Sequence, residues 1–375
     1  MIHRKLQENI INLLGSNKAI VIMGARQVGK STLLKQMLGN DDNVLWMNGD
    51  DIDVQNLFKE MTSSRLKAII GNKRFVVIDE AQRIEEIGLK LKLITDQIPS
   101  TQVLASGSSS FELGNKVNES LAGRKREFKL FPLSFSEMVE HTNFLEEMRM
   151  IPHRMIYGYY PEVVNNPGDE KNVLYELTNS YLYKDVLSMD GIRNAEKLVK
   201  LIKALALQIG SQVSYNEVGQ LIDLDPKTVE RYVDILEKSY IIFRLGSFAR
   251  NIRNELKASR KIFFWDLGIR NAVIGNMAQV ENRTDTGELW ENFLIAERLK
   301  KNSYKTSFAQ SWFWRTQSQK EIDYLEDEDG ILHAFEFKWN DKKANAKCPE
   351  IFTKAYENST FKVITPKNID EFLLG

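Results

Sequence analysis

The sequence predicts an α/β protein in which a P-loop sheet of parallel strands precedes a helical and winged-helix region and a second α/β region. Apolar runs of strand length alternate with helical stretches over the first third of the chain, and a G-x-x-x-x-G-K-S motif follows the first run. This rhythm indicates a parallel sheet with helices on both faces. The expected divisions are 1–133 for the P-loop core, 134–195 for a helical lid, 196–250 for a winged helix, 251–283 for a connecting segment and 284–375 for the last α/β domain.

Apolar runs mark the strands of the first region. Residues 18–24, "KAIVIMG", are continuously apolar, as expected for a buried parallel strand. Helices are expected from about Lys30, before Ile70 and at "EIGLKLKLITDQI". The remaining strands are expected at "NVLWMN", "RFVVIDEAQ", "TQVLASG" and "REFKLFPLSF".

The rest of the chain is expected to be helical first and then mixed. Residues 134–207 carry a helical pattern. Helices at 215–222 and 226–238, followed by the strand-like "YIIFRLGSF", outline a winged helix-turn-helix. A long helix at "GELWENFLIAERLKK" precedes strands at "WFWRT", "EIDYL" and "ILHAFEFKW", and a helix near 350–357 and the strand "KVIT" complete the pattern.

Composition and charge restrict the class of protein. A chain of 375 residues exceeds one typical core and indicates two or three domains. The 51 lysine and arginine residues equal the 51 aspartate and glutamate residues, so contact with nucleic acid requires a local basic patch. Cys348 is the only cysteine, which excludes an intramolecular disulfide. Without an apolar run of membrane-spanning length or a signal-like start, we expect a cytoplasmic protein with no membrane partner.

Residues 24–32, "GARQVGKST", fit a phosphate-binding loop between a strand and a helix. The glycines let the loop curl so that backbone N–H groups point at nucleotide phosphates. Lys30 is expected to reach the terminal phosphates, and Ser31 to offer its hydroxyl to Mg²⁺. The alternative is a glycine turn that happens to precede a lysine. The expected nucleotide-binding residues of the loop are Gly24, Ala25, Arg26, Gln27, Val28, Gly29, Lys30, Ser31 and Thr32.

Acidic and hydroxyl side chains end the neighbouring strands. "FVVIDEAQ" delivers Asp79 and Glu80 at a strand end, where ligands bind in open parallel sheets. Asp79 is expected to hold the Mg²⁺ shell, and Glu80 to orient and deprotonate the attacking water. Ser106, in the "SGSSS" cluster, is a candidate sensor of the γ-phosphate, although a serine-rich turn is the simpler alternative.

Arg124 in "LAGRKREF" is a candidate arginine finger. Such a residue stabilises the transition state of phosphoryl transfer, usually across a subunit boundary. Lys125 and Arg126 follow it directly, so plain surface charge is the alternative for all three.

Two segments in the middle of the chain carry basic residues. Lys227, Thr228 and Arg231 lie near the start of the second winged-domain helix, where a recognition helix meets bases, although packing is the alternative. The block 250–261 could grip a phosphate backbone or seat the last domain, and the second interpretation is favoured because "IFFWDLG" must be buried. Its basic residues are Arg250, Arg253, Lys257, Arg260 and Lys261.

The stretch "KEIDYLEDEDGILHAFEFKW" predicts a hairpin with Asp323 on one strand and Glu336 and Lys338 on the other. In metal-dependent nucleases two such acids ligate Mg²⁺, and the lysine orients water and balances phosphate charge. Strand alternation places Glu336 and Lys338 on one face. The alternative is the polar face of an ordinary hairpin, with "EDEDG" as its solvated tip.

These motifs, with "LFPLSFSEM", "YGYYPEV", "NIRNELKASRKIFFWDLGIRN" and "GELWENFLIAERL", resemble a family of prokaryotic AAA-type ATPases. The resemblance covers nearly the whole chain. It implies an ATPase core, a winged-helix middle and a C-terminal PD-(D/E)xK domain, that is, a restriction-endonuclease-like α/β fold. It also implies a third acidic metal ligand, Glu291, and places Ile322 where the pattern has proline.

The sequence therefore predicts an ATP-hydrolysing switch, with ATP and Mg²⁺ as cofactors, whose nucleotide state controls a nuclease-like domain that binds or cleaves nucleic acid. A first alternative is a non-nucleolytic regulator in which the winged helix binds DNA and ATP sets the oligomeric state. A second is a signalling or assembly ATPase whose last domain binds protein. A homo-oligomer is compatible with each of them.

Overall fold

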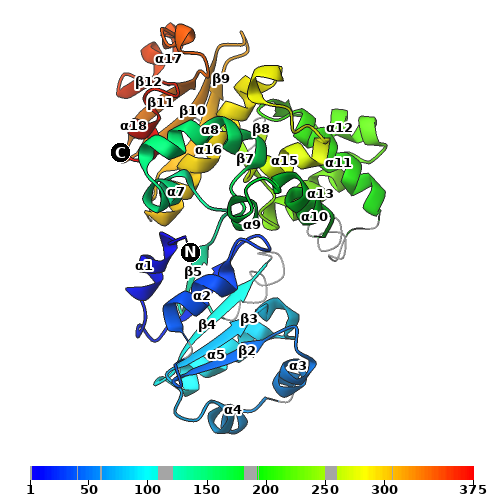
Figure 1. Ribbon diagram of the computed structural model, residues 1–375, viewed down its shortest axis with the longest axis vertical. Helices are drawn as coiled ribbons and strands as arrows, with labels where there is room; N and C mark the ends of the chain where they lie inside the picture. Colours follow the sequence, from blue (N-terminus) through cyan, green and yellow to red (C-terminus); the bar gives the residue numbers. More distant parts are fainter. Residues whose placement is uncertain are drawn as a thin grey trace. The chain divides into compact units, whose positions relative to one another are not determined.

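The computed structural model describes residues 2–39, 41–59, 61–108, 121–180, 192, 194–249, 260–305 and 307–375. The chain forms two compact units (Figure 1). Unit 1 comprises Met1–Pro132 with Lys238–Tyr240, and unit 2 comprises Leu133–Glu237 with Ile241–Gly375. The finer division into five segments stays a prediction.

Unit 1 contains the parallel sheet that the sequence predicts. Its strand order is β2-β3-β4-β1-β5, and every neighbouring pair is parallel. The strands are β1 (Ala19–Met23), β2 (Val44–Asn48), β3 (Phe75–Asp79), β4 (Gln102–Gly107) and β5 (Lys125–Lys129). All residues of β1 are buried, which explains its continuous apolar run. Strand β4 lies between β1 and β3, and all three run parallel. Their carboxyl ends therefore lie side by side at the same edge of the sheet.

The helices of unit 1 follow the strands as the alternation predicts. They are α1 (Leu6–Ile11), α2 (Lys30–Leu38), α3 (Ile52–Lys59), α4 (Ser63–Ile70), the 3₁₀ turn η1 (Ala81–Arg83) and α5 (Ile87–Gln97). Both α2 and α5 contact β4, and α5 also contacts β1. The first turn of α2 therefore stands at the carboxyl end of β1, directly after the glycine loop.

Unit 2 contains a mixed sheet of order β12-β11-β10-β9-β7-β8-β6. Its strands are β6 (Gln212–Val213), β7 (Ile242–Ser247), β8 (Arg260–Phe264), β9 (Gln310–Arg315), β10 (Glu321–Glu328), β11 (Ile331–Phe337) and β12 (Ser359–Ile364). β9, β10 and β11 form an antiparallel meander, whereas β12 pairs parallel with β11 and β7 pairs parallel with β9. Strands of the expected winged segment thus share one sheet with the C-terminal strands.

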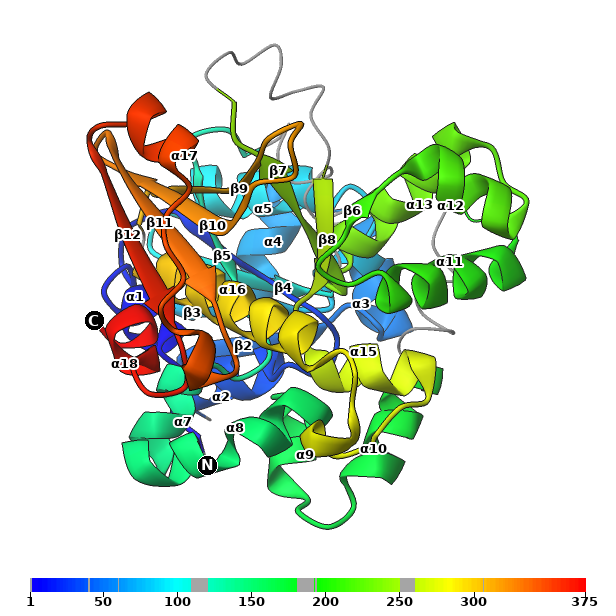
Figure 2. The same cartoon turned by 90° about the horizontal axis from the view of Figure 1, so that it is seen from above.

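Helix α16 (Thr286–Tyr304) contacts β8 and β11, and Figure 2 shows it in yellow along the sheet. The other helices described after β5 are α7 (Phe135–His141), α8 (Phe144–Tyr157), α9 (Pro161–Asn165), α10 (Glu170–Leu177), α11 (Ala195–Leu207), α12 (Tyr215–Ile222), α13 (Pro226–Lys238), α15 (Leu267–Ile274), η4 (Val280–Asn282), η5 (Asp341–Lys343), α17 (Glu350–Ala355) and α18 (Ile369–Leu373). Of these, α12 and α13 have the bounds that the sequence predicts. Within the described parts of the chain, no helix combines the length and apolarity needed to cross a membrane.

The hairpin of β10 and β11 differs from the expectation at its tip. Glu328 pairs with Ile331, so the turn is Asp329 and Gly330 alone, with φ values of 54° and 83°. Aspartate followed by glycine suits this two-residue turn because both positions need positive φ. Glu326 belongs to the strand, is only 1% exposed and accepts hydrogen bonds from Arg298. The prediction that "EDEDG" is a solvated tip is therefore wrong for Glu326.

Candidate functional sites

Backbone geometry shapes the loop at residues 24–32 in unit 1. A Cβ atom on Gly24 would lie 2.0 Å from the carbonyl oxygen of Leu130, so only glycine fits there. Gly29 has φ of 97° and Gln27 has φ of 62°, which curls the loop before α2 begins. Ala25 and Val28 are fully buried. These residues place the N-terminus of α2 and the loop backbone where an anion is favoured.

Lys30 lies inside this loop. Its side chain is 5% exposed, and Nζ donates hydrogen bonds to the carbonyl oxygens of Gly24 (2.9 Å) and Ala25 (2.8 Å). Burial lowers the pKa of Lys30 to about 8, although the carboxylates of Glu80 and Asp79 act to raise it. A buried ammonium group at the start of a helix is suited to an anionic ligand such as a phosphate.

Asp79, at the end of β3, is the centre of a small polar network. One of its oxygens accepts a hydrogen bond from Ser31 at 2.5 Å, and the other accepts one from Ser106. A hydroxyl and a carboxylate are the oxygen donors that Mg²⁺ prefers, so Ser31 and Asp79 fit the ion. Ser106 is fully buried and orients Asp79. Its predicted role as a γ-phosphate sensor stays a prediction.

Glu80 is held by a residue that the sequence analysis missed. Gln82 Nε2 donates hydrogen bonds to Glu80 Oε2 (2.6 Å) and to Ser108 Oγ (3.0 Å), at the end of β4. Glu80 itself has a left-handed backbone, with φ of 47°. The arrangement holds the carboxylate beside Asp79. The one available signal was the position of Gln82 in "DEAQ".

Arg4 also escaped the sequence analysis. It is 4% exposed, and its guanidinium donates to the carbonyl oxygens of Val28 (2.7 Å) and Phe131 (2.6 Å). Arg4 therefore ties the phosphate-binding loop to the segment after β5. Nothing in the sequence separates it from the other charges of the amphipathic start.

Arg124 lies at the end of the sheet opposite the phosphate-binding loop, where the amino ends of the strands are. It precedes β5, which runs parallel to β1 with Ala19 opposite Lys125, whereas the loop follows the far end of β1. Its half-exposed side chain pairs with Asp96 at 2.7 Å. Arg124 thus does not reach the loop of its own chain. Action across a subunit boundary stays a prediction.

In unit 2 the structure brings together Asp323 and Glu336. They occupy adjacent strands in which Tyr324 is paired with Phe335. Lys338 Nζ contacts Glu336 Oε1 at 2.5 Å, and the Phe337 N–H donates to Asp323 Oδ2 at 2.8 Å. Burial and the nearby Glu336 carboxylate raise the pKa of Asp323. The predicted nuclease-like residues thus form one partly buried cluster.

Glu291 reaches the same cluster from α16. Burial raises its pKa, as does Asp323, whereas Lys261 opposes the increase. Lys261 on β8 is 2% exposed and contacts Glu291 Oε1 at 2.8 Å and Glu321 Oε1 at 2.5 Å. The idea that Lys261 grips a phosphate backbone is therefore wrong, because its ammonium group is buried and the carboxylates of Glu291 and Glu321 hold it. Arg250, Arg253 and Lys257 lie outside the described residues.

The cluster has the donor chemistry of a divalent-metal site, since carboxylate oxygens are preferred by Mg²⁺. As the side chains stand, however, no three carboxylate, imidazole or thiolate groups of the described residues are grouped so as to hold a metal ion. Ion pairs with Lys261 and Lys338 instead neutralise Glu291 and Glu336. The assignment of Glu291, Asp323 and Glu336 as metal ligands stays a prediction.

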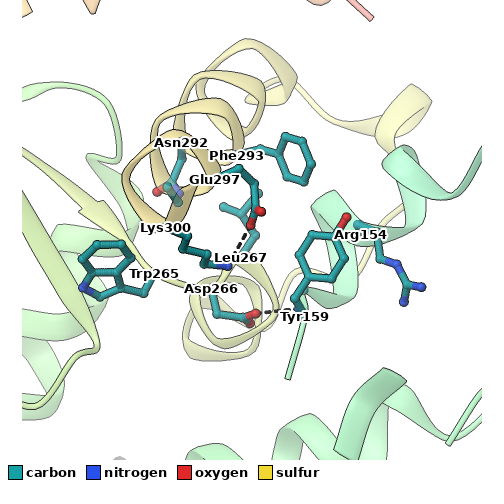
Figure 3. A pocket seen from close by; sticks show the side chains of 11 residues that line it. Arg154, Tyr159, Trp265, Asp266, Leu267, Asn292, Phe293, Glu297 and Lys300 are labelled. Carbon is teal, nitrogen blue, oxygen red and sulfur yellow. Dashed lines mark hydrogen bonds and ion pairs between the residues drawn. The ribbon is translucent and has the colours of Figure 1, made fainter. Parts of the chain in front are cut away.

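A second buried polar cluster lies where α16 meets the segments around Tyr159 and Asp266 (Figure 3). Asp266 accepts a hydrogen bond from the Tyr159 N–H at 2.6 Å, and Glu297 accepts one from Lys300 at 2.7 Å. The cavity measures about 10 Å³, which is at the lower limit for one water molecule. This cluster is thus a satisfied polar core and not a ligand site.

The expected recognition helix, α13, presents two of its three candidate residues to solvent. Lys227 and Arg231 are exposed, whereas Thr228 is half-buried. Its N–H donates to Asp225 Oδ1 at 3.0 Å, so Asp225 and Thr228 form the helix cap. DNA reading by this helix stays a prediction.

Three family profiles match consecutive parts of the chain. Residues 16–139 match the profile described as AAA domain. Residues 148–280 and 286–371 match two profiles described as domains of unknown function, DUF8612 and DUF4143. Lys261 thus lies in the second match, whereas Glu291, Asp323 and Glu336 lie in the third.

Relatives and solved structures resemble the chain over most of its length. An uncharacterised protein of Methanocaldococcus jannaschii is 22% identical over 93% of this chain and 82% of its own. An uncharacterised protein of Haemophilus influenzae is 25% identical over 85% and 83%, respectively. A Walker-type ATPase of Pyrococcus abyssi aligns with a TM-score of 0.51 and 15% identity, covering 73% of this chain and 96% of that one. The profile match identifies an AAA domain at residues 16–139, and the aligned structure shows a similar fold.

Proposed function

We propose that the chain is an ATP-hydrolysing switch whose nucleotide state controls a nuclease-like region that binds or cleaves nucleic acid. The observation that carries the proposal is the partly buried cluster of Glu291, Asp323 and Glu336 with Lys338, in a chain that also has a phosphate-binding loop. Such control requires that ATP and ADP make different contacts in the two states of the protein.

In the ATPase part, Lys30 binds the terminal phosphates, and the backbone N–H groups of the loop surround them. Ser31 and Asp79 hold Mg²⁺, which neutralises charge on the phosphate oxygens when it is bound. Glu80, aligned by Gln82, orients the attacking water and accepts its proton. Arg124 acts on the nucleotide of a second copy of the chain.

In the nuclease-like part, Asp323, Glu336 and Glu291 hold a divalent metal ion, which supplies charge neutralisation at a phosphodiester when bound. Lys338 lies against Glu336 and orients a water molecule while balancing developing phosphate charge. Partly buried acids on two strands and a helix support this assignment, because carboxylates that lie together are costly without cations and a divalent ion would add to the positive charge of Lys261 and Lys338.

A non-nucleolytic DNA-binding regulator is the second candidate. Two observations favour it. Lysine ion pairs already neutralise Glu291 and Glu336, and α13 exposes Lys227 and Arg231. In this case the cluster is a scaffold, and ATP sets the oligomeric state of the DNA-binding protein.

A cleavage assay on supercoiled, linear and single-stranded DNA tests the proposal, with Mg²⁺ or Mn²⁺ and with or without ATP. Wild type, Glu336→Ala and Lys30→Ala are compared with Glu328→Ala, which removes an exposed acid of the same hairpin. We expect cleavage to be lost in Glu336→Ala, retained in Glu328→Ala and made independent of ATP, or lost, in Lys30→Ala. Intact DNA in every lane, from protein that hydrolyses ATP and binds DNA, would establish the second candidate instead.

A further inference from the structure

We propose that Lys261 is a built-in cation that competes with a divalent metal ion for Glu291, and so controls metal loading of the nuclease-like cluster. The inference rests on the proposed function, because it concerns the same three carboxylates. It adds a regulatory residue that comes from a different part of the chain, since Lys261 is 30 residues before Glu291 and lies on β8.

The position of Lys261 is fixed by three neighbours. Its ammonium group contacts Glu291 Oε1 on α16 at 2.8 Å and Glu321 Oε1 at the start of β10 at 2.5 Å. It also lies 5.3 Å from the centroid of the Phe313 ring on β9. A lysine that is 2% exposed needs such anionic partners, because a buried charge without them is strongly destabilising. Lys261 thus occupies a place in the cluster where a cation is required.

The two carboxylates that hold Lys261 differ in their other partners. Glu321 also pairs with Arg315, with 3.2 Å between Nη1 and Oε2. Of the described side chains, only Lys261 forms an ion pair with Glu291. Lys261 can therefore keep Glu321 and release Glu291, provided that another cation takes over Glu291.

A divalent metal ion at Asp323 and Glu336 is that cation. Two carboxylates give a weak site, and Glu291 is the third oxygen ligand that would strengthen it. While Lys261 holds Glu291, the metal must replace this ion pair, and the measured metal affinity is reduced by the competition.

The test is a titration of the full chain with Mn²⁺ alone, followed by electron paramagnetic resonance of free Mn²⁺, which requires no catalytic activity. Lys261→Met keeps most of the aliphatic stem but removes the charge. We expect Mn²⁺ affinity to rise by about tenfold or more in Lys261→Met, and the gain to disappear in a background of Glu291→Gln. Lys320→Met, which removes an exposed lysine beside Glu321, is the matched control and should leave the affinity unchanged.

A second variant protects the test against misfolding. Lys261→Gln is neutral but keeps a hydrogen-bond donor towards Glu291, and it should also bind Mn²⁺ more tightly than wild type. In both variants Mn²⁺ should raise the melting temperature more than it does in wild type, because the ion replaces the lost charge partner.

The outcomes separate the inference from the proposed function. If Asp323→Asn abolishes Mn²⁺ binding but removal of the Lys261 charge leaves affinity unchanged or lower in folded protein, the metal site stands and the competition is refuted. If neither wild type nor the Lys261 variants bind Mn²⁺, the metal site itself is refuted, and the competition with it.

Discussion

Arg4 joins two segments of unit 1 through backbone carbonyl groups that have no sequence signature. Its guanidinium donates to Val28 and Phe131 from a nearly buried position. Leaving a buried acceptor without its donor costs about 1–3 kcal/mol. We predict that Arg4→Met destabilises unit 1 by about 2–4 kcal/mol and weakens ATP binding, because Val28 belongs to the phosphate-binding loop.

Urea denaturation and titration with a fluorescent ATP analogue measure the two effects of Arg4→Met. Lys67→Met, which removes an exposed cation on α4, is the control and should change neither quantity. Unchanged nucleotide affinity in a destabilised Arg4→Met protein would limit Arg4 to a structural role.

Gln82 is expected to affect ATP hydrolysis and not ATP binding, because its amide contacts Glu80 and Ser108. We predict that Gln82→Ala lowers the kcat of ATP hydrolysis by about tenfold. General base catalysis contributes a rate enhancement of about 10²- to 10⁴-fold, and a misaligned base loses part of it. The Kd for ATP should stay nearly constant, because the amide has no part in the phosphate-binding loop.

Steady-state hydrolysis and direct nucleotide binding together decide this prediction. Glu80→Gln is the reference variant and should lose more activity than Gln82→Ala while still binding ATP. A Gln82→Ala protein with wild-type kcat would show that Glu80 needs no support from Gln82.

At the scale of elements, Asp285 connects α15 with the start of α16. Its carboxylate accepts hydrogen bonds from Arg283 at 2.8 Å and from Arg270 at 2.6 Å. Burial acts to raise the pKa of Asp285, but the hydrogen bonds from Arg283 and Arg270 outweigh it and lower the pKa to about 2. Because this value lies below the unfolded value of 3.8, the carboxylate stabilises the folded state above about pH 4.

We predict that this stabilisation, about 2 kcal/mol, is lost as the pH falls from about 4 through about 2. Asp285→Asn should remove that part of the pH dependence and lower the stability at pH 7. Urea denaturation at a series of pH values measures both effects. Asp329→Asn, at the exposed hairpin turn, should keep the wild-type profile. An Asp285→Asn profile parallel to that of wild type would contradict the prediction.

Elements whose signal is local were predictable from the sequence. The apolar run of β1 and the proline at the start of α13 gave bounds within one or two residues of those observed. The phosphate-binding loop was equally accessible, because its chemistry depends on fixed spacing within nine residues. Asp79 and Glu80 followed because a buried strand delivers them to the same edge of the sheet.

Contacts between distant segments were not predictable. Arg4 reaches partners 24 and 127 residues away, and both are backbone carbonyls that any residue supplies. Lys261 belongs to a basic run that predicts either contact with a phosphate backbone or seating of the last domain, and β8 pairs with β7 and carries it into the sheet of unit 2. Only the fold brings its charge to Glu291 and Glu321.

At the scale of the whole molecule, the proposed control of unit 2 by ATP has a thermodynamic consequence that needs no knowledge of how the units are arranged. Coupling between two ligand sites is reciprocal, so DNA must change ATP affinity by the same factor by which ATP changes DNA affinity. We predict that each ligand changes the affinity for the other by at least about fivefold. Glu80→Gln is the protein of choice, because slow hydrolysis keeps ATP intact during the titrations.

Four titrations measure the coupling: ATP binding with and without saturating DNA, and DNA binding with and without saturating ATP. Equal factors in the two directions are expected for Glu80→Gln. In Lys30→Ala, ATP should no longer alter DNA affinity, because the phosphates lose their buried ammonium partner. DNA binding that is strong but indifferent to ATP would mean that the two units work independently, and the chain would then be an ATPase joined to a nucleic-acid-binding domain without a switch between them.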